Sequence, residues 1–409
     1  YFCKMTLKST IIFVFIFYVQ TYAQNIKSIQ LRPQQENSFS AIVPLGTILE
    51  LSFDDLDADS KDYQYKIEHM THNWESSRLL PSQYIDGFDQ NTIINVTNSF
   101  NTFQSYTHYA VTIPNINTII TKSGNYLLSV LNDDDEVVFT RRFVFYEKAA
   151  TVGVSVVRSR NALTADKQQT VQFSINHPNF QINNPQQEIN AVIIKNNNWN
   201  ETITNINPTF FKPNQLLYTY TNKTNFWGGN EYLNFDTKII RNNSLNVVKV
   251  VRKDVFHHYL YPLTYNPYLG YSFNPDINGQ FVIRTIEAAD PRTEADYAMM
   301  HFSISTEAPI PIKKIYVYGA FNDFKIEEEN LLTYNSKDKA YQANILLKQG
   351  FYNYTYATVD DENQVDTNSI TGSFFMTENE YTVITYYRPF GSLFDRVIGV
   401  GTAIFDQNR

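Results

Sequence analysis

Residues 124–146 read GNYLLSVLNDDDEVVFTRRFVFY, two strand-like runs separated by an Asn/Asp cluster. Aromatic and β-branched residues favour strands, and a short Asn/Asp segment between two such runs is typical of a β-hairpin turn. The same rhythm occurs earlier, where residues 48–53 (ILELSF) and 63–68 (YQYKIE) alternate on either side of an acidic stretch. These segments predict short strands joined by turns, a pattern typical of an immunoglobulin-like β-sandwich.

The rest of the chain shows the same pattern of short strands and turns. Tyr (29) and Phe (30) are abundant and Gly (14) is sparse, while few windows carry apolar residues at helical spacing. Further strand-like runs cover residues 154–157, 170–175, 188–195, 245–251, 314–319, 341–346, 351–359 and 381–387. We therefore expect an all-β protein built from tandem immunoglobulin-like β-sandwich domains.

The length of 409 residues predicts several domains, because single cores stop growing near 250–300 residues. The strand pattern places the first domain at residues 24–147 and the second at residues 148–272. A connector over residues 273–296 and a third domain over residues 297–409 follow. Residues 261–271 (YPLTYNPYLGY) pack prolines among aromatics, which disfavours a central strand and indicates connecting chain.

The N-terminal region has the features of a secretory signal. Lys4 and Lys8 precede the apolar run 11–19, and small residues follow at Thr21 and Ala23. This arrangement predicts a signal peptide over residues 1–23, with translation starting at Met5. A run of nine apolar residues is too short for a transmembrane helix.

Cysteine usage and charge limit the chemistry of the exported chain. The single cysteine, Cys3, lies before the apolar run, so the mature chain is expected to have neither a disulfide nor a lipid anchor. The formal net charge is −8, with 33 Lys and Arg residues, so we expect no nucleic-acid partner.

Two groups of residues are candidate metal ligands. The run Asp54, Asp55, Asp57 and Asp59 suits a hard cation such as calcium, although a solvated turn between strands explains it equally well. His69 and His72 have a spacing that zinc ligands adopt, but no partner ligands can be named, so core or edge histidines are the better interpretation. No nucleophile elbow, phosphate loop or His-Glu-x-x-His motif is present, so we expect neither an enzyme nor a cofactor.

Two sets of tyrosines are candidate partner-binding residues, because Tyr is favoured in interface hot spots. Alternation within residues 351–356 places three of them on one face of a strand, and a polyproline-like conformation would align three more in the Pro-rich stretch. The six residues are Tyr265, Tyr268, Tyr271, Tyr352, Tyr354 and Tyr356. The alternative is that both sets cover a core or join domains.

The third domain resembles the early-set immunoglobulin fold of glycogen-binding modules. The resemblance rests on residues 315–324 (IYVYGAFNDF) and 347–356 (LKQGFYNYTY). It implies periplasmic or surface glycan binding as an alternative function. Those modules usually have a tryptophan where Phe324 stands, which weakens the inference of sugar binding.

Several longer stretches together resemble the plug protein family of the type IX secretion system of Bacteroidota, formerly a domain of unknown function. They include residues 51–59 (LSFDDLDAD), 84–88 (YIDGF), 289–297 (ADPRTEADY) and 387–391 (YRPFG), and also 261–271, 318–322, 350–360, 372–375 and 377–381. The resemblance covers nearly the whole mature chain.

This resemblance implies a role but no individual site residues. Plug proteins of this family occupy the periplasmic mouth of a giant outer-membrane translocon barrel, called SprA, and close it when no substrate is in transit. The resemblance therefore implies a periplasmic protein on the inner side of the outer membrane, with SprA as its partner.

Overall fold

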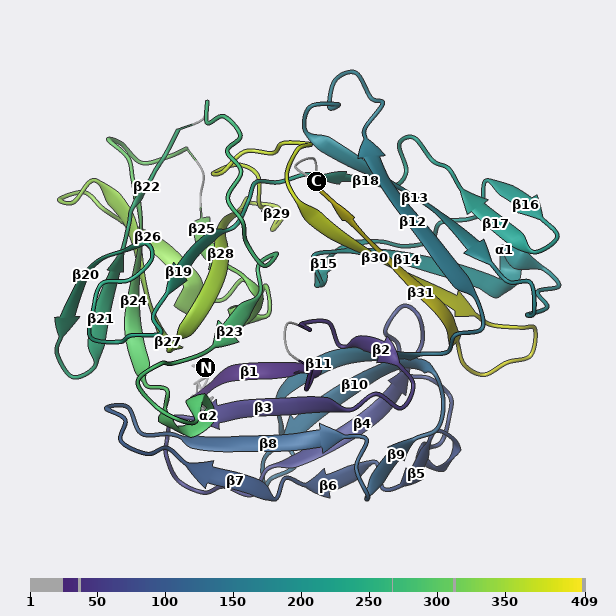
Figure 1. The fold of residues 1–409 in the computed structure, drawn as a ribbon, viewed down its shortest axis with the longest axis horizontal. Coiled ribbons are helices and arrows are strands. Elements are labelled where there is room, and N and C mark those ends of the chain that lie inside the picture. Colours follow the sequence, from purple (N-terminus) through teal and green to yellow (C-terminus); the bar gives the residue numbers. More distant parts are fainter. Residues whose placement is uncertain (1–24, 36–37, 267, 312–313, 407–409) are drawn as a thin grey trace, which may run out of the picture.

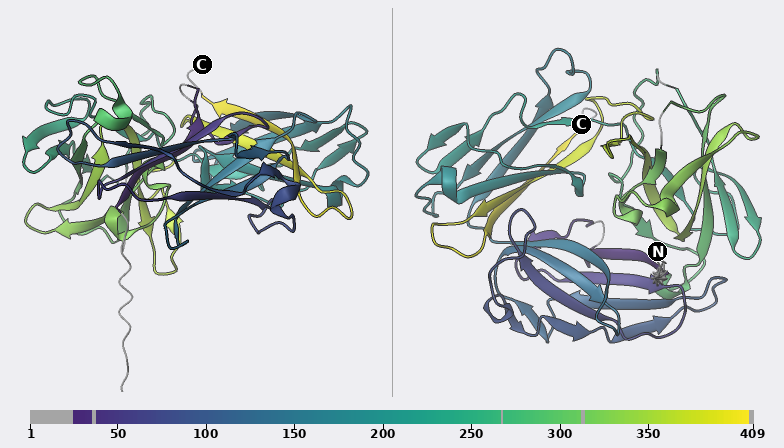
Figure 2. Two further views of the ribbon diagram at one scale, coloured as in Figure 1. Left: turned by 90° about the horizontal axis from the view of Figure 1, so that it is seen from below. Right: turned by 180° about the vertical axis from the view of Figure 1, so that it is seen from behind.

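The computed structural model describes residues 25–35, 38–266, 268–311 and 314–406. The predicted signal peptide 1–23, with Met5 and Cys3, lies outside these residues. The prediction of an all-β protein is confirmed, since the only helices in the described ranges are single turns such as α1 (Pro185–Glu188) and α2 (Pro291–Glu294). Three β-sandwiches lie around a common centre (Figure 1), and the body is flat when it is seen from the edge (Figure 2).

The first domain is a sandwich formed by the N-terminal part of the chain. The hairpin predicted over residues 124–146 is present, with Gly124 opposite Phe145 across the two strands. One sheet contains β1 (Ile26–Pro33), β3 (Leu49–Asp55), β8 (Thr107–Ile113) and β7 (Asn95–Asn98); the other contains β2 (Ile42–Pro44), β11 (Val137–Tyr146), β10 (Gly124–Leu131), β4 (Gln64–Met70) and β6 (Gln90–Thr92). Inward residues that alternate along these strands, such as Leu49, Leu51 and Phe53, are fully buried in its core.

The second domain combines strands from the middle and the end of the chain. One sheet contains β12 (Thr151–Arg158), β13 (Gln168–Asn176), β17 (Gln215–Tyr218), β16 (Phe210–Lys212) and β18 (Asn225–Trp227); the other contains β15 (Asn198–Ile203), β14 (Ile189–Lys195), β30 (Asn379–Tyr387) and β31 (Arg396–Phe405). Ile193 lies opposite Val383 across β14 and β30, and both side chains are buried in the core between the sheets.

The third domain is built from residues between those two parts. Its strands are β19 (Leu233–Asp236), β20 (Val247–Arg252), β21 (Phe256–Leu260), β22 (Leu263–Thr264), β23 (Phe281–Ile283), β24 (Tyr297–Ser305), β25 (Lys314–Tyr318), β26 (Leu331–Asn335), β27 (Ala340–Lys348), β28 (Gly350–Val359) and β29 (Val365–Asp366). They form one continuous sheet that folds over on itself through β26, so β28 and β24 contribute residues to the same core.

The sheets divide the chain differently from the predicted boundaries. The predicted third domain, 297–409, loses β30 and β31 to the second domain, whereas the third domain begins with β19, inside the predicted range 148–272. The predicted connector 273–296 contains β23, which pairs with β28. The physical reason is that backbone hydrogen bonds of a strand can be satisfied by any open sheet edge, however distant in sequence.

Most of the strands predicted from the sequence are present within about two residues. The segment 381–387, for example, lies in β30, and the segment 351–359 lies in β28. Within the described ranges no helix has the length and apolar character that a membrane span requires.

Candidate functional site

The tyrosines of β28 lie on one face, as predicted, but that face is in the core. Tyr352, Tyr354 and Tyr356 are 1%, 4% and 1% exposed and belong to the apolar cluster of the third domain. The ring of Tyr352 stacks on Phe235 at a centroid distance of 5.2 Å. They cannot contact a partner while the domain is folded, so their assignment to partner binding is wrong and the core interpretation holds. Glycan binding was inferred from the fold of this domain, and these three buried side chains are not accessible to stack on a sugar.

The tyrosines of the Pro-rich stretch are not brought together in one strip. Tyr265 packs against the core of the third domain, and Tyr271 donates a 2.6 Å hydrogen bond to Glu231 Oε1. Tyr268 lies at the surface and is 91% exposed. Only Tyr268 therefore has the exposure that a partner-binding residue needs, and a role for it stays a prediction.

The acidic run separates into two parts with different surroundings. Asp55, Asp57 and Asp59 converge on the Lys61 ammonium, with N–O distances of 2.9, 2.5 and 3.4 Å. Their carboxylate oxygens lie close enough together to be considered as cation ligands, but Lys61 already supplies the positive charge there. The hydrogen bonds from Lys61 and Asn25 also hold the pKa of Asp57 below its usual value. Lys61 offsets one of the three carboxylate charges and its ion pairs hold the turn, so calcium binding is not needed to explain the arrangement.

Asp54 points the other way and is the centre of the contact between the first and third domains. Its Oδ2 lies 2.7 Å from the ammonium of Lys348, and both side chains are at most 2% exposed. Tyr297 donates its hydroxyl to the same oxygen over 2.7 Å, and His108 Nδ1 lies 2.7 Å from Oδ1. Burial lowers the pKa of Lys348, and the attraction of Asp54 opposes that shift. The pair is thus a desolvated, hydrogen-bonded link between two sandwiches.

A second element of this contact is the turn that precedes β24. The Asp296 carboxylate accepts the backbone N–H groups of Phe103 and Gln104 over 2.7 and 3.1 Å. Tyr106 donates its hydroxyl to the Ala295 carbonyl over 2.8 Å. Burial raises the pKa of Asp296, although these N–H groups favour its charged form. The stretches 51–59 and 289–297 therefore meet at one domain contact.

The contact between the first and second domains is mainly apolar. A separate cluster of buried residues joins β11 of the first domain to β14, β30 and β31 of the second: Val144, Val192, Ile194, Ile384, Tyr386 and Val397. Beside it, the Trp74 and Trp199 rings meet edge to face at 4.8 Å. Arg396 of the second domain pairs with Glu147 over 2.6 Å at its edge.

The second and third domains are joined by amide and hydroxyl groups. Asn200 Nδ2 donates to the Phe324 carbonyl over 2.8 Å, and both Asn198 and Asn200 lie 3.3 Å from the Tyr318 hydroxyl. All three pairs of domains are therefore in direct contact, and the body closes into a ring. Such a body is suited to filling space as one unit.

The predicted histidine pair is divided between two environments near the contact of the first and second domains. His69 is 2% exposed among the rings of Tyr84, Tyr126 and Phe394, and burial lowers its pKa to about 4. His72 instead lies 3.2 Å from the Asp395 carboxylate. The two residues form no shared metal site among the described residues, and the structural interpretation explains them.

An exposed apolar tip lies at one end of the first domain. Here the strand β5 (Ile85–Gly87) pairs with β9 (Thr118–Ile120), and the Phe88 N–H donates to the Asn117 carbonyl over 2.8 Å. Phe88, Ile116 and Ile119, which we call the tip residues, are 68%, 93% and 45% exposed. Gly87 has φ +107°, and a Cβ there would lie 2.2 Å from the Asn117 oxygen, so the turn requires glycine.

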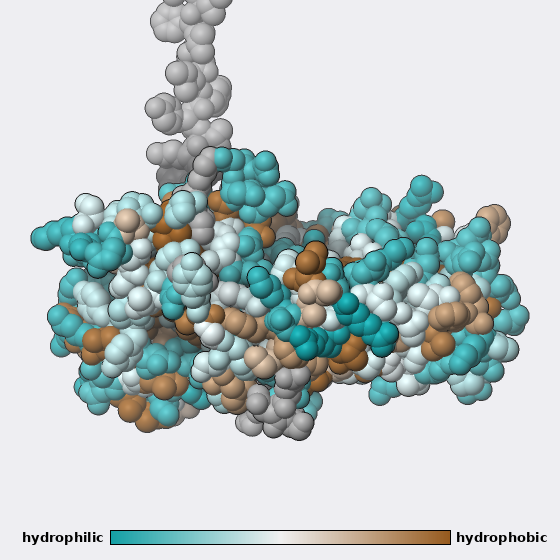
Figure 3. Space-filling model, turned by 90° about the horizontal axis from the view of Figure 1, so that it is seen from above, coloured by the Kyte–Doolittle hydropathy of each residue, from teal (hydrophilic) through white to brown (hydrophobic). Residues whose placement is uncertain are grey.

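Other exposed apolar side chains are spread over all three domains, some of them as neighbouring pairs such as Phe210 and Phe211. Figure 3 shows small apolar groups among polar surface on the edge that it views. The tip is notable because Phe88 belongs to the stretch 84–88 and Ile119 lies on β9, which pairs with β5 of that stretch. Exposed apolar residues that gather on one rigid element are typical of an interaction surface.

Two of three comparisons with known proteins found a match. Residues 26–147, the first domain, match the family model described as the first domain of the type 9 secretion system plug protein. A solved structure of a hypothetical protein from Parabacteroides merdae is similar over 93% of this chain and 97% of its own, with a TM-score of 0.88 and 32% sequence identity. No curated protein matches the chain.

Proposed function

Because the chain belongs to the family of type IX secretion system plug proteins, as its first domain shows, we propose that it seals the periplasmic opening of that system's outer-membrane translocon barrel, SprA, when no substrate is in transit. The match of residues 26–147 carries this proposal. The family role associates the chain with the type IX system in the cell envelope. A periplasmic location, reached through the predicted signal peptide, is part of the proposal.

The three-domain body supports the proposal physically. A plug must resist deformation, and each sandwich here contacts both others through buried groups, among them the Asp54–Lys348 pair and the cluster around Ile384. The proposal makes the protein a binding protein and not an enzyme, and it needs neither cofactor nor metal. The apolar tip of the first domain is the surface that we assign to the translocon, because it lies within the matched residues.

Deletion of the gene tests the sealing role. We expect the outer membrane of the deletion strain to admit large hydrophilic dyes and antibiotics, because the translocon remains assembled but open. Expression of the chain with residues 1–23 should restore the barrier, and expression of a form without residues 5–23 should not. Unchanged permeability with the translocon still present would contradict the proposal.

Affinity purification tests the assigned surface. The full chain with Phe88→Asp should retain its unfolding midpoint, because Phe88 is 68% exposed, but should recover less translocon from solubilised outer membranes. Leu163→Asp is the control, since Leu163 is an exposed apolar residue (90%) of the second domain. Equal recovery with both variants would remove the tip from the proposal while leaving the sealing role open.

A further inference from the structure

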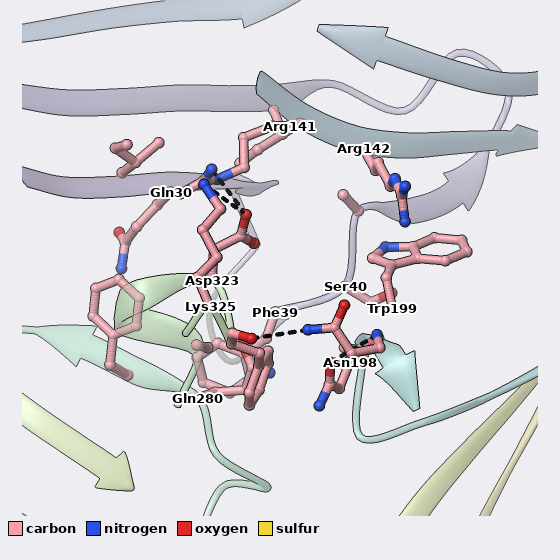
Figure 4. A pocket seen from close by; sticks show the side chains of 18 of the residues that line it. Gln30, Phe39, Ser40, Arg141, Arg142, Asn198, Trp199, Gln280, Asp323 and Lys325 are labelled. Atoms are coloured by element: carbon pink, nitrogen blue, oxygen red, sulfur yellow. Dashed lines mark hydrogen bonds and ion pairs between the residues drawn. The ribbon is translucent and has the colours of Figure 1, made fainter. Parts of the chain in front are cut away.

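A cavity of about 630 Å³ lies where the three domains meet. Its walls come from β1 and β11 of the first domain, residues 197–200 of the second and residues 318–327 of the third (Figure 4). Its volume lies within the range of about 300–1,000 Å³ that is usual for ligand sites, and domain interfaces are a common place for them.

The walls of this central cavity are positively charged, although the whole chain has a net charge of −8. Arg32, Arg141, Arg142 and Lys325 line it, against the two carboxylates of Asp323 and Glu327. A local excess of cations in an acidic protein concentrates the field on an anionic ligand.

Among the described residues, two of the four cations have a carboxylate at ion-pair distance and two do not. Arg141 lies 3.2 Å from Asp323, and Figure 4 shows this pair together with Lys325. Within the described part of the chain, no carboxylate lies at ion-pair distance from Arg32 or Arg142. Burial lowers the pKa of both arginines, while the charge of Glu50 opposes the shift of Arg32 and that of Asp323 opposes the shift of Arg142.

The Arg142 guanidinium is held in place by aromatic rings. It lies 4.7 Å from the ring centroid of Trp74 and 5.9 Å from that of Trp199. Stacking fixes the plane of a guanidinium while leaving its N–H groups free to donate, and the Arg142 guanidinium makes no hydrogen bond to another described residue. Such a pre-positioned fork suits a carboxylate, which accepts two parallel hydrogen bonds.

The cavity also has apolar walls, which a simple anion would not use. Trp199 and Phe324 line it together with the arginines. A ligand that carries both carboxylates and apolar side chains matches both kinds of wall, and an extended acidic peptide segment has this chemistry.

We propose that the central cavity binds an acidic, extended segment of a protein partner, with its carboxylates on Arg32 and Arg142 and its apolar side chains against Trp199 and Phe324. This inference goes beyond the proposed sealing role and does not depend on it. It requires the ring to be closed, because each domain supplies part of the walls.

Peptide binding to the full mature chain tests the proposal. The probe is a hexapeptide of alternating glutamate and leucine with both ends blocked, and its control replaces every glutamate by glutamine. We expect the acidic peptide to bind by titration calorimetry and to change tryptophan emission, because Trp199 lines the site. The control peptide should bind at least about tenfold more weakly, the effect of losing a charge-assisted hydrogen bond.

Charge-neutralising variants locate the binding. Arg142→Gln and Arg32→Gln should each weaken binding of the acidic peptide at least about tenfold. Arg160→Gln, at an exposed arginine outside the cavity, should leave it unchanged. Parent-like unfolding midpoints would establish that each variant is folded, and two independent arginines protect the test against the loss of one.

Three results would overturn the proposal. They are equal binding of the two peptides, parent-like affinity in both arginine variants, and displacement of the peptide by an equimolar amount of inorganic phosphate, which would indicate a site for small anions only. None of these results bears on membrane sealing, so the two proposals fail separately.

Discussion

The first domain contacts its two neighbours through chemically opposite surfaces. Towards the third domain it presents a buried carboxylate, Asp54, which meets the ammonium of Lys348 at 2.7 Å. Towards the second domain it presents Val144, which packs among apolar residues such as Ile384. We call these the ionic contact and the apolar contact.

The difference shows how the two contacts divide stability and specificity. Moving apolar surface out of water stabilises any well-packed arrangement. The apolar contact therefore stabilises the association of the two domains but restricts their relative orientation only weakly. A buried ion pair gains little over apolar residues of similar volume, but an unpaired buried charge is very unfavourable. The ionic contact therefore favours one relative placement of the first and third domains.

The largest expected effect is the loss of one partner of the ionic contact. Lys348→Ala leaves Asp54 buried without its counter-charge, so the free energy of unfolding should fall by about 4 kcal/mol. Urea unfolding followed by circular dichroism measures it. Lys339→Ala, which removes an exposed ion pair with Glu307, is the matched control and should leave the midpoint unchanged.

Simultaneous replacement of both partners sharpens the test. The double variant Asp54→Leu with Lys348→Met should recover most of the stability that Lys348→Ala loses, because no buried charge remains unpaired. A double variant as unstable as Lys348→Ala would show that the neighbouring hydroxyl and imidazole groups, and not the ion pair, dominate the contact.

The apolar contact should respond to loss of volume. Ile384 is fully buried, so Ile384→Ala should lower the free energy of unfolding by about 3 kcal/mol through lost burial and the cavity that remains. The same urea experiment measures it. A loss below about 1 kcal/mol would mean that the two sandwiches move together to fill the space.

The stability of the region around the apolar contact should also depend on pH. Burial lowers the pKa of His69, whose ring packs on Phe394 of the second domain, to about 4 from an ordinary 6.5. The unfolded chain therefore takes up a proton first, so stability is full above pH 6.5 and falls as the pH drops towards 4. The loss should be on the order of 2 kcal/mol.

Unfolding midpoints measured at pH 7.5 and pH 4.5 for the parent and for His69→Gln test this dependence. The variant should show a smaller fall between the two pH values. An equal fall in both proteins would assign the acid sensitivity to other groups, among them the Glu147 carboxyl, whose pKa the hydrogen bonds from Arg396 and Ser123 hold below its usual value despite burial.

The smallest expected effect concerns one hydroxyl at the apolar contact. Tyr386 donates to Asn125 Oδ1 over 2.8 Å, and both residues are buried. Tyr386→Phe keeps the ring and removes this hydrogen bond, so the free energy of unfolding should fall by about 1 kcal/mol. An unchanged midpoint would show that this hydrogen bond adds nothing to stability and that burial of apolar side chains alone stabilises the contact.

The prediction of the strands succeeded because their signal is local. Alternation along residues 48–53 and the Asn/Asp turn near residue 133 predict β3 and the β10–β11 hairpin from a few neighbouring side chains. The family resemblance also came from short contiguous stretches, and the match over the first domain confirms it.

The candidate site residues could not be predicted in the same way. Alternation correctly places Tyr352, Tyr354 and Tyr356 on one face, but it cannot tell whether another sheet covers that face. The central cavity could not be predicted from neighbouring residues either, because Arg32, Arg142 and Trp199 lie on strands that are distant in the sequence. A guanidinium without a carboxylate partner is visible only when all of its neighbours are known.

The sequence by itself determined the all-β character, the strand segments and the family, since each depends on residues that are close together in the chain. Only the tertiary structure decided that β30 returns to the second domain and that Asp54 pairs with Lys348 across 294 positions. The apolar run in β30 predicts a strand buried on both faces, but not the sheet that it joins. That choice depends on which open strand edge and which apolar surfaces remain unpaired once the neighbouring sandwiches have formed.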